Sequence, residues 1–125
     1  MGQKLFLGLS ALLWFPYGLY CFFVPTALAE IAGVTSTSAT GTTELRAMYG
    51  GLQAALGVLA FAGMQSASLT HAALITLATV TAGLGSTRLL GALTDGAWSA
   101  YTLMGLLFEL GSVLWATALL RRGDG

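Results

Sequence analysis

The sequence predicts an all-α fold, a four-transmembrane-helix antiparallel bundle that forms one integral membrane domain over residues 1–125. The chain is 56% hydrophobic and only 8% charged, whereas soluble domains are about 25% charged. Four apolar segments are each long enough to cross ~30 Å of hydrocarbon at ~1.5 Å per residue. The second and third connections are short, which favours antiparallel neighbours.

The first predicted span covers residues 5–24. Pro16 lies in its middle and should kink it, although neighbouring helices can satisfy the backbone groups that a proline leaves free. Lys4 followed by an apolar run also resembles a secretory signal peptide. The run is longer than the usual apolar core of such a peptide, so we expect the segment to be retained as a span.

Residues 25–43 form the longest polar stretch and are predicted to be an outer loop. Its second half is rich in serine and threonine, and a short interfacial turn is expected at residues 27–32. Thr42 or Thr43 could cap the next helix, because a hydroxyl oxygen accepts a hydrogen bond from an unpaired N–H of the first turn.

The remaining spans are predicted at residues 44–64, 69–93 and 97–120. Two of them carry stripes of small residues at every fourth position: Ala47, Gly51 and Ala55, then Gly83, Thr87 and Gly91. Such stripes let membrane helices approach closely. We expect them to pack inside the bundle, and homodimerisation is the alternative.

Basic residues at the two chain ends predict the orientation. Lys4, Arg121 and Arg122 flank the first and last spans, and residues 25–43 contain no basic residue. An excess of lysine and arginine marks the cytoplasmic side of a membrane protein. With an even number of spans, both termini are expected in the cytoplasm.

Glu109 is the most unusual residue, because it is a carboxylate inside an otherwise apolar run. An ionisable group near the bilayer centre costs at least ~2.5–3.5 kcal/mol on insertion scales, so it normally faces inward and has a partner or a function. Other polar side chains are expected beside it, toward the outer side: Glu44, Arg46, Tyr49, Gln53, Arg88 and Asp95. Arg46, Tyr49 and Gln53 should share one helix face at i, i+3 and i+7.

A purely structural interpretation of these charges is available. Guanidinium groups pair bidentately with carboxylates. The two arginines could therefore clamp the shallower carboxylates and tie helix ends together, with Arg46 and Arg88 on one side and Glu44 and Asp95 on the other.

Glu109 lies too deep for that arrangement. It could be neutral, since a low dielectric disfavours a charged carboxylate, and hydrogen-bonded to Tyr49, Gln53 or Tyr101. In the functional interpretation, all seven polar residues line a pocket with apolar walls. Such a pocket suits an amphiphilic ligand with one polar head, such as a quinone, an isoprenoid or a lipid.

No motif in the chain specifies a reaction. HExxH, GxSxG, CxxC and phosphate-binding glycine loops are all missing. The single Cys21 and the single His71 cannot make an internal disulfide or a metal site, so no metal and no cofactor are expected. Five basic and five acidic residues balance, which argues against a nucleic-acid partner. Whether the protein is an enzyme stays open.

Several motifs resemble those of a known family: ELRAMYGGLQ at residues 44–53, RLLG at 88–91, Asp95-Gly96 and then Glu109. They resemble the domain-of-unknown-function 4345 family of small bacterial membrane proteins, in the DoxX-like group, over residues 12–120. The family pattern often has proline after the Asp-Gly pair, where this chain has Ala97.

The resemblance implies a multi-pass, four-helix protein of the bacterial inner membrane, but it implies no reaction. Some DoxX-like proteins are subunits of quinone-linked oxidoreductases. The alternative to a ligand site is an accessory subunit of a larger membrane complex, because a 125-residue chain with short loops offers little surface except its lipid-facing walls. Its contacts would be the lipid bilayer and a membrane-protein partner or a second copy of the chain.

Overall fold

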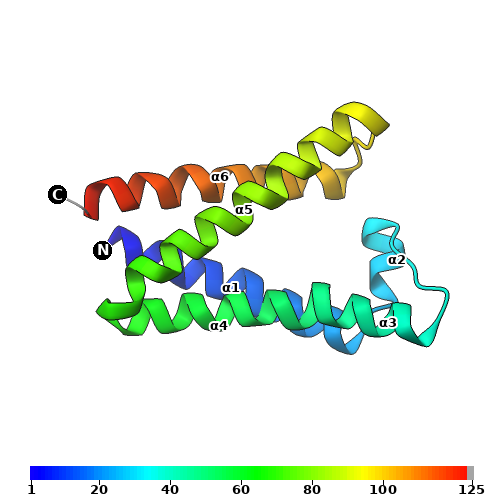
Figure 1. Cartoon of the computed structure of the whole chain (residues 1–125), viewed down its shortest axis with the longest axis horizontal. Coiled ribbons are helices and arrows are strands. Elements are labelled where there is room, and N and C mark those ends of the chain that lie inside the picture. Colours follow the sequence, from blue (N-terminus) through cyan, green and yellow to red (C-terminus); the bar gives the residue numbers. More distant parts are fainter. Residues whose placement is uncertain (124–125) are drawn as a thin grey trace.

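Four long helical runs make up most of the computed structural model, which describes residues 1–123 (Figure 1). The first is α1 (Gly2–Phe23). The second, Ala39–Gln65, is continuous and consists of α3 (Ala39–Leu45), the π-helix η1 (Arg46–Gly51) and α4 (Leu52–Gln65). The third and fourth are α5 (Ala67–Asp95) and α6 (Ala100–Gly123), and a short α2 (Ala27–Ala32) lies between the first two runs. All four runs are long and apolar enough to cross a membrane, which confirms the predicted fold class.

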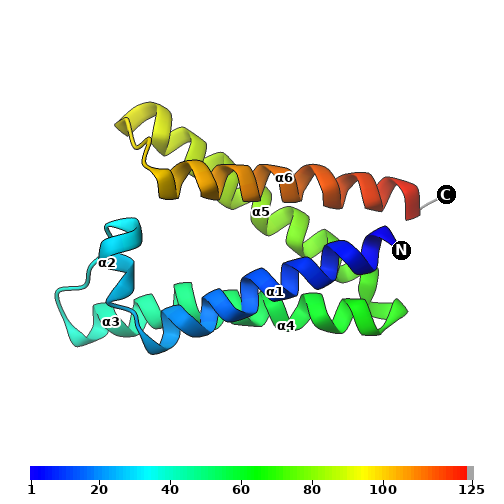
Figure 2. The ribbon, with the colours of Figure 1, turned by 180° about the vertical axis from the view of Figure 1, so that it is seen from behind.

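The four runs alternate in direction, so the two chain ends lie at the same end of the molecule (Figures 1 and 2). We call this the terminus end, and it also carries the tight turn between α4 and α5. The opposite end, called the loop end, carries α2 and the connection between α5 and α6. Which end faces the cytoplasm stays a prediction.

The helix boundaries follow local capping. The second run begins at Ala39 and not at residue 44, because the Ser38 hydroxyl accepts a hydrogen bond from the Gly41 N–H at 3.0 Å. The expectation that Thr42 or Thr43 caps this helix was therefore wrong. Their hydroxyls donate instead to backbone carbonyls of the preceding turn.

Turns at the loop end also have local causes. The short turn expected at residues 27–32 is present as α2, and it ends at Gly33 with a φ of 70°. Gly96 ends α5 with a φ of 67°, a left-handed conformation that glycine adopts without steric cost. α6 then begins at Ala100 and not at residue 97, and the Thr102 N–H donates to the Ser99 hydroxyl at 3.2 Å.

Glycines let α1 pack closely along the second run. A Cβ on Gly18 would lie 2.4 Å from the Ala54 nitrogen, and one on Gly57 would lie 2.6 Å from the Phe15 nitrogen. A larger residue at either position would force the two backbones apart. Close approach of this kind supplies the van der Waals contact that holds membrane helices together.

The small-residue stripes predicted to pack inside the molecule do not do so. A Cβ on Gly83 or Gly91 would meet no atom within 4 Å, and one on Gly51 would meet only a carbonyl of its own helical run at 3.9 Å. The prediction was wrong at these three positions. The second run presents Gly50 and Gly57 to α1 instead.

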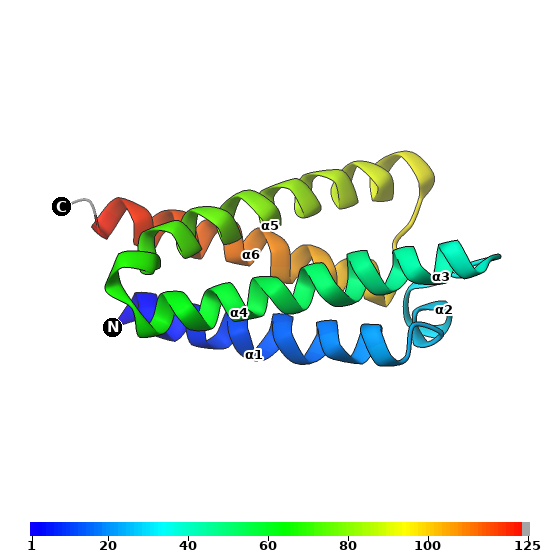
Figure 3. The same cartoon turned by 60° about the horizontal axis from the view of Figure 1, so that its bottom comes forward.

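The molecule consists of two helix pairs that join through an apolar core. α1 lies along the second run and α5 lies along α6, and the two pairs diverge toward the loop end (Figures 1 and 3). The buried core residues are Phe6, Leu7, Trp14, Leu56, Ala60, Ala73, Leu74, Leu77, Ala116 and Leu119. Most of them come from the halves of the helices nearer the terminus end, so the core lies there. Many large apolar side chains, such as Leu12, Leu107 and Leu114, are exposed on the outside, as lipid-facing positions require.

Candidate functional site

An ion pair between α5 and α6 is the centre of the candidate site. Arg88 donates from Nε to Oε1 of Glu109 at 2.7 Å and from Nη2 to Oε2 at 2.9 Å. The Glu109 side chain is 4% exposed, whereas that of Arg88 is 26% exposed. Both carboxylate oxygens are therefore occupied by one guanidinium group, which is always charged in proteins. The hypothesis of a neutral Glu109 bonded to Tyr49, Gln53 or Tyr101 was wrong.

Chain geometry explains why these two residues meet. Arg88 lies about 10 Å before the end of α5, and Glu109 lies about 14 Å into α6, at ~1.5 Å per residue. The two helices are antiparallel and are joined by a short connection, so side chains at similar distances from that connection face each other. A carboxylate and a guanidinium at the same depth in an apolar region pair, because either one alone would be costly.

Two glycines make room for the pair, one on each helix. A Cβ on Gly105 of α6 would lie 2.9 Å from Arg88 Nε, and a Cβ on Gly85 of α5 would lie 3.3 Å from Glu109 Cβ. Each charged side chain thus lies against a glycine of the opposite helix. Neither glycine was identified from the sequence, although each lies about one turn from the charged residue on its own helix.

Tyr101 extends the site toward the other helix pair. The Arg88 Cζ lies over the Tyr101 ring, 5.7 Å from its centroid, a geometry in which the ring face attracts the cation. The Tyr101 hydroxyl is 2.8 Å from the Tyr17 hydroxyl of α1, and the two share a hydrogen bond. Tyr17 was missed, because it lies among other aromatic residues that no pattern distinguishes from it.

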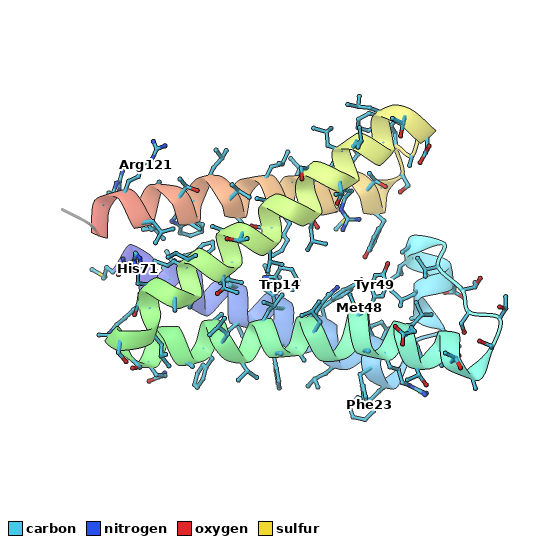
Figure 4. The ribbon with its side chains drawn as sticks, in the orientation of Figure 1. Trp14, Phe23, Met48, Tyr49, His71 and Arg121 are labelled. Atoms are coloured by element: carbon cyan, nitrogen blue, oxygen red, sulfur yellow. The ribbon has the colours of Figure 1, made fainter. Side chains whose placement is uncertain are left out.

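Tyr49 and Gln53 of the second run are half-buried. Figure 4 shows Tyr49 pointing into the space between the two helix pairs, nearer the loop end than Trp14. Trp14 packs edge-to-face on Phe108 of α6, with ring centroids 5.6 Å apart. The polar side chains of the site therefore border the apolar core. We call them the polar layer: Tyr17, Tyr49, Arg88, Tyr101 and Glu109.

Three of the predicted site residues lie apart from this layer. Glu44 and Asp95 are exposed, and within residues 1–123 the Arg88–Glu109 pair is the only ion pair. Arg46 is exposed too, and its Nε donates to the Phe22 carbonyl at 3.1 Å. The predicted clamps to Glu44 and Asp95 were therefore wrong.

The π-helix explains why Arg46 leaves the face of Tyr49. A π-helix closes its hydrogen bonds at i+5 instead of i+4, so residues three apart no longer point the same way. Arg46 instead satisfies a carbonyl at the end of α1 that has no acceptor role within that helix. The i, i+3, i+7 spacing assumed a regular α-helix.

The guanidinium of Arg88 retains unused donors. Arginine has five N–H groups, and Glu109 accepts two of them. Nη1 has no hydrogen-bond partner in the described part of the chain. Arg88 can therefore donate to an oxygen acceptor that is not part of this chain, while Glu109, already paired, fixes its position.

Two hollows in the surface lie away from this ion pair. One, of about 320 Å³, is apolar and is formed by α1 and α4 around Phe15, Pro16 and Gly57. The other, of about 200 Å³, lies at the loop end between Pro25 and Leu45. Neither hollow is lined by any of the seven predicted site residues. A ligand at Arg88 would therefore contact the exposed edge of the guanidinium and would not occupy either hollow.

In a comparison with protein families, the family described as "Domain of unknown function (DUF4345)" matches residues 2–120. The searches of curated proteins and of solved structures found no match.

Proposed function

The chain belongs to the DUF4345 family, and from its geometry we propose that it binds a lipophilic small molecule within the membrane. The polar head of this molecule would accept a hydrogen bond from Arg88, and its tail would lie among apolar side chains. A quinone, an isoprenoid or a lipid has this chemistry. The expected location is the bacterial inner membrane.

The unused donors of Arg88 are the observation that carries the proposal. A guanidinium inside a membrane span is costly and normally has a function or a full set of partners. Here the Arg88 side chain is 26% exposed and Nη1 has no partner within residues 1–123. An oxygen acceptor from a ligand would complete its hydrogen bonding at a place where water is scarce.

The surrounding residues support this use of Arg88. Glu109 and the Tyr101 ring hold the guanidinium, so little conformational entropy is lost when it donates. The hydroxyl of Tyr17, hydrogen-bonded to Tyr101, and that of Tyr49, which points into the space between the helix pairs (Figure 4), offer further polar contacts.

An accessory subunit is the second candidate, and a different observation favours it. The outer face of α5 carries Gly83, Thr87 and Gly91, and a Cβ on either glycine would meet nothing within 4 Å. A helix of a partner protein could approach this face closely. In that role the ion pair would serve only to join α5 to α6.

Native mass spectrometry of the protein, extracted from its own membrane in mild detergent, tests both candidates. We expect a bound small molecule that is lost in Arg88→Ala and kept in Arg46→Ala, which removes an exposed arginine outside the site. Thermal unfolding of both variants should first show that each is folded. A bound partner chain with no small molecule would overturn the ligand proposal and favour the accessory role.

A further inference from the structure

We infer that the head group taken at Arg88 is electrically neutral, a carbonyl or hydroxyl oxygen instead of a phosphate or carboxylate. This inference rests on the proposed function and narrows its ligand class. It concerns the charge of the site, which the geometry of the ion pair and the distribution of the other charges determine.

The ion pair itself has no net charge. Both oxygens of Glu109 are bound by Arg88, so one negative charge lies directly against the one positive charge of the site. The remaining N–H groups of Arg88 can still donate to a carbonyl or hydroxyl oxygen. An anionic head would instead be placed beside the Glu109 carboxylate, and like charges in contact repel strongly where water is excluded.

No second cation toward the loop end is positioned to offset this repulsion. Between residues 26 and 100, the charged side chains other than Arg88 are Glu30, Glu44, Arg46 and Asp95, three carboxylates and one guanidinium, with a net charge of −2. The Nε of Arg46 donates to the Phe22 carbonyl. Lys4 and Arg122 belong to the ends of α1 and α6 that lie at the terminus end, where Figure 4 also shows Arg121.

The other polar groups near Arg88 are also uncharged. Tyr17 and Tyr101 share a hydrogen bond, the Tyr101 ring lies under the guanidinium, and Tyr49 points into the space between the helix pairs (Figure 4). Phosphate sites typically combine several charged donors or a helix N-terminus. Hydroxyls around one neutralised guanidinium are suited to an uncharged acceptor.

Two probes with the same tail test this inference: farnesol, which has a neutral head, and farnesyl monophosphate, which has an anionic head. Each is titrated into the full-length protein in phosphatidylcholine nanodiscs, and bound probe is counted by native mass spectrometry. Empty nanodiscs correct for partition into the lipid. We expect the wild type to bind farnesol at least about tenfold more tightly than the phosphate.

Variants then separate charge from fold. Glu109→Gln leaves the Arg88 charge unbalanced, so the preference should disappear or reverse in favour of the phosphate. Glu44→Gln removes an exposed carboxylate outside the pair and should retain the preference. If Glu109→Gln does not fold, the wild-type comparison of the two probes still decides the question.

The outcomes distinguish this inference from the proposed function. Tighter binding of farnesyl monophosphate to the wild type, lost in Arg88→Ala, would overturn the neutral-head inference and keep the ligand site. Binding of both probes that is unchanged in Arg88→Ala, or binding of neither, would overturn the proposed function and the inference with it.

Discussion

The half of the molecule nearer the terminus end, called the terminus half, and the half nearer the loop end, called the loop half, are held together in different ways. In the terminus half, the two helix pairs meet around an apolar core that includes Leu7, Leu74 and Ala116, each with no exposed surface. In the loop half the pairs diverge, and the interior polar groups are a partly buried ion pair and a half-buried, hydrogen-bonded pair of tyrosines. Apolar packing needs many shape-matched contacts, whereas a polar layer depends on a few specific partners.

This difference suggests a division of roles. Membrane helices gain little from the hydrophobic effect, so close packing must hold the terminus half together. The loop half can then retain a charged pair with unused donors, because it is not the main source of stability. Substitutions in the two halves should have different consequences for fold and for binding.

The largest effect is expected in the terminus half, at Gly63. A Cβ there would lie 2.6 Å from the Ala73 Cβ, so Gly63→Leu should force α4 and α5 apart and destabilise the protein by about 3 kcal/mol or more. Gly83→Leu is the matched control, because a Cβ at this position would meet nothing within 4 Å. Thermal unfolding in detergent measures both, and equal unfolding temperatures would contradict the proposed division.

The next largest effect is expected at the ion pair. Glu109→Leu leaves the Arg88 charge without its partner and should cost about 3 kcal/mol. The double variant Arg88→Met with Glu109→Leu should recover most of that loss, because a well-packed apolar pair of similar volume is often neutral for stability. Chemical denaturation of the wild type, the single variants Glu109→Leu and Arg88→Met, and the double variant gives the coupling energy. A double variant that is less stable than Glu109→Leu alone would show that the pair is essential to the fold.

A smaller effect should follow from filling the space beside Arg88. Gly105→Ala would place a Cβ 2.9 Å from Arg88 Nε, so the guanidinium must shift and its bidentate geometry is lost, at about 1–2 kcal/mol. The free energy of ligand binding should weaken by more than the free energy of unfolding does. Gly111→Ala, whose Cβ would meet nothing within 4 Å, is the control for adding a methyl group to α6. Unchanged ligand affinity in Gly105→Ala would show that Gly105 does not contribute to the ligand site.

The smallest effect is expected at the tyrosine pair. Tyr17→Phe removes the hydrogen bond to Tyr101 between α1 and α6 and should cost about 0.5–1 kcal/mol. Hydrogen exchange of backbone amides in the loop half should increase, while that of the core segments in the terminus half should stay the same. Increased exchange in both halves would mean that they are not independent.

Much of the fold was predictable because the membrane limits the alternatives. Backbone polar groups in hydrocarbon must pair within a helix, so a long apolar run is sufficient to predict one. Arg88 and Glu109 were also identified, because each interrupts such a run. Their partners were not, since pairing depends on helix phase and depth. The π-helix at residues 46–51 changed the phase and moved Arg46 away from Tyr49.

The sequence by itself determined the four spans, the composition typical of a membrane protein and Glu109 as the residue that needs a partner. Only the tertiary structure selected Arg88 as that partner, placed Gly85 and Gly105 against the pair and left Gly83 and Gly91 on an open face. Local composition decides whether a segment is helical in lipid. Which face of each helix meets its neighbour depends on packing summed over the whole chain, which no single segment contains.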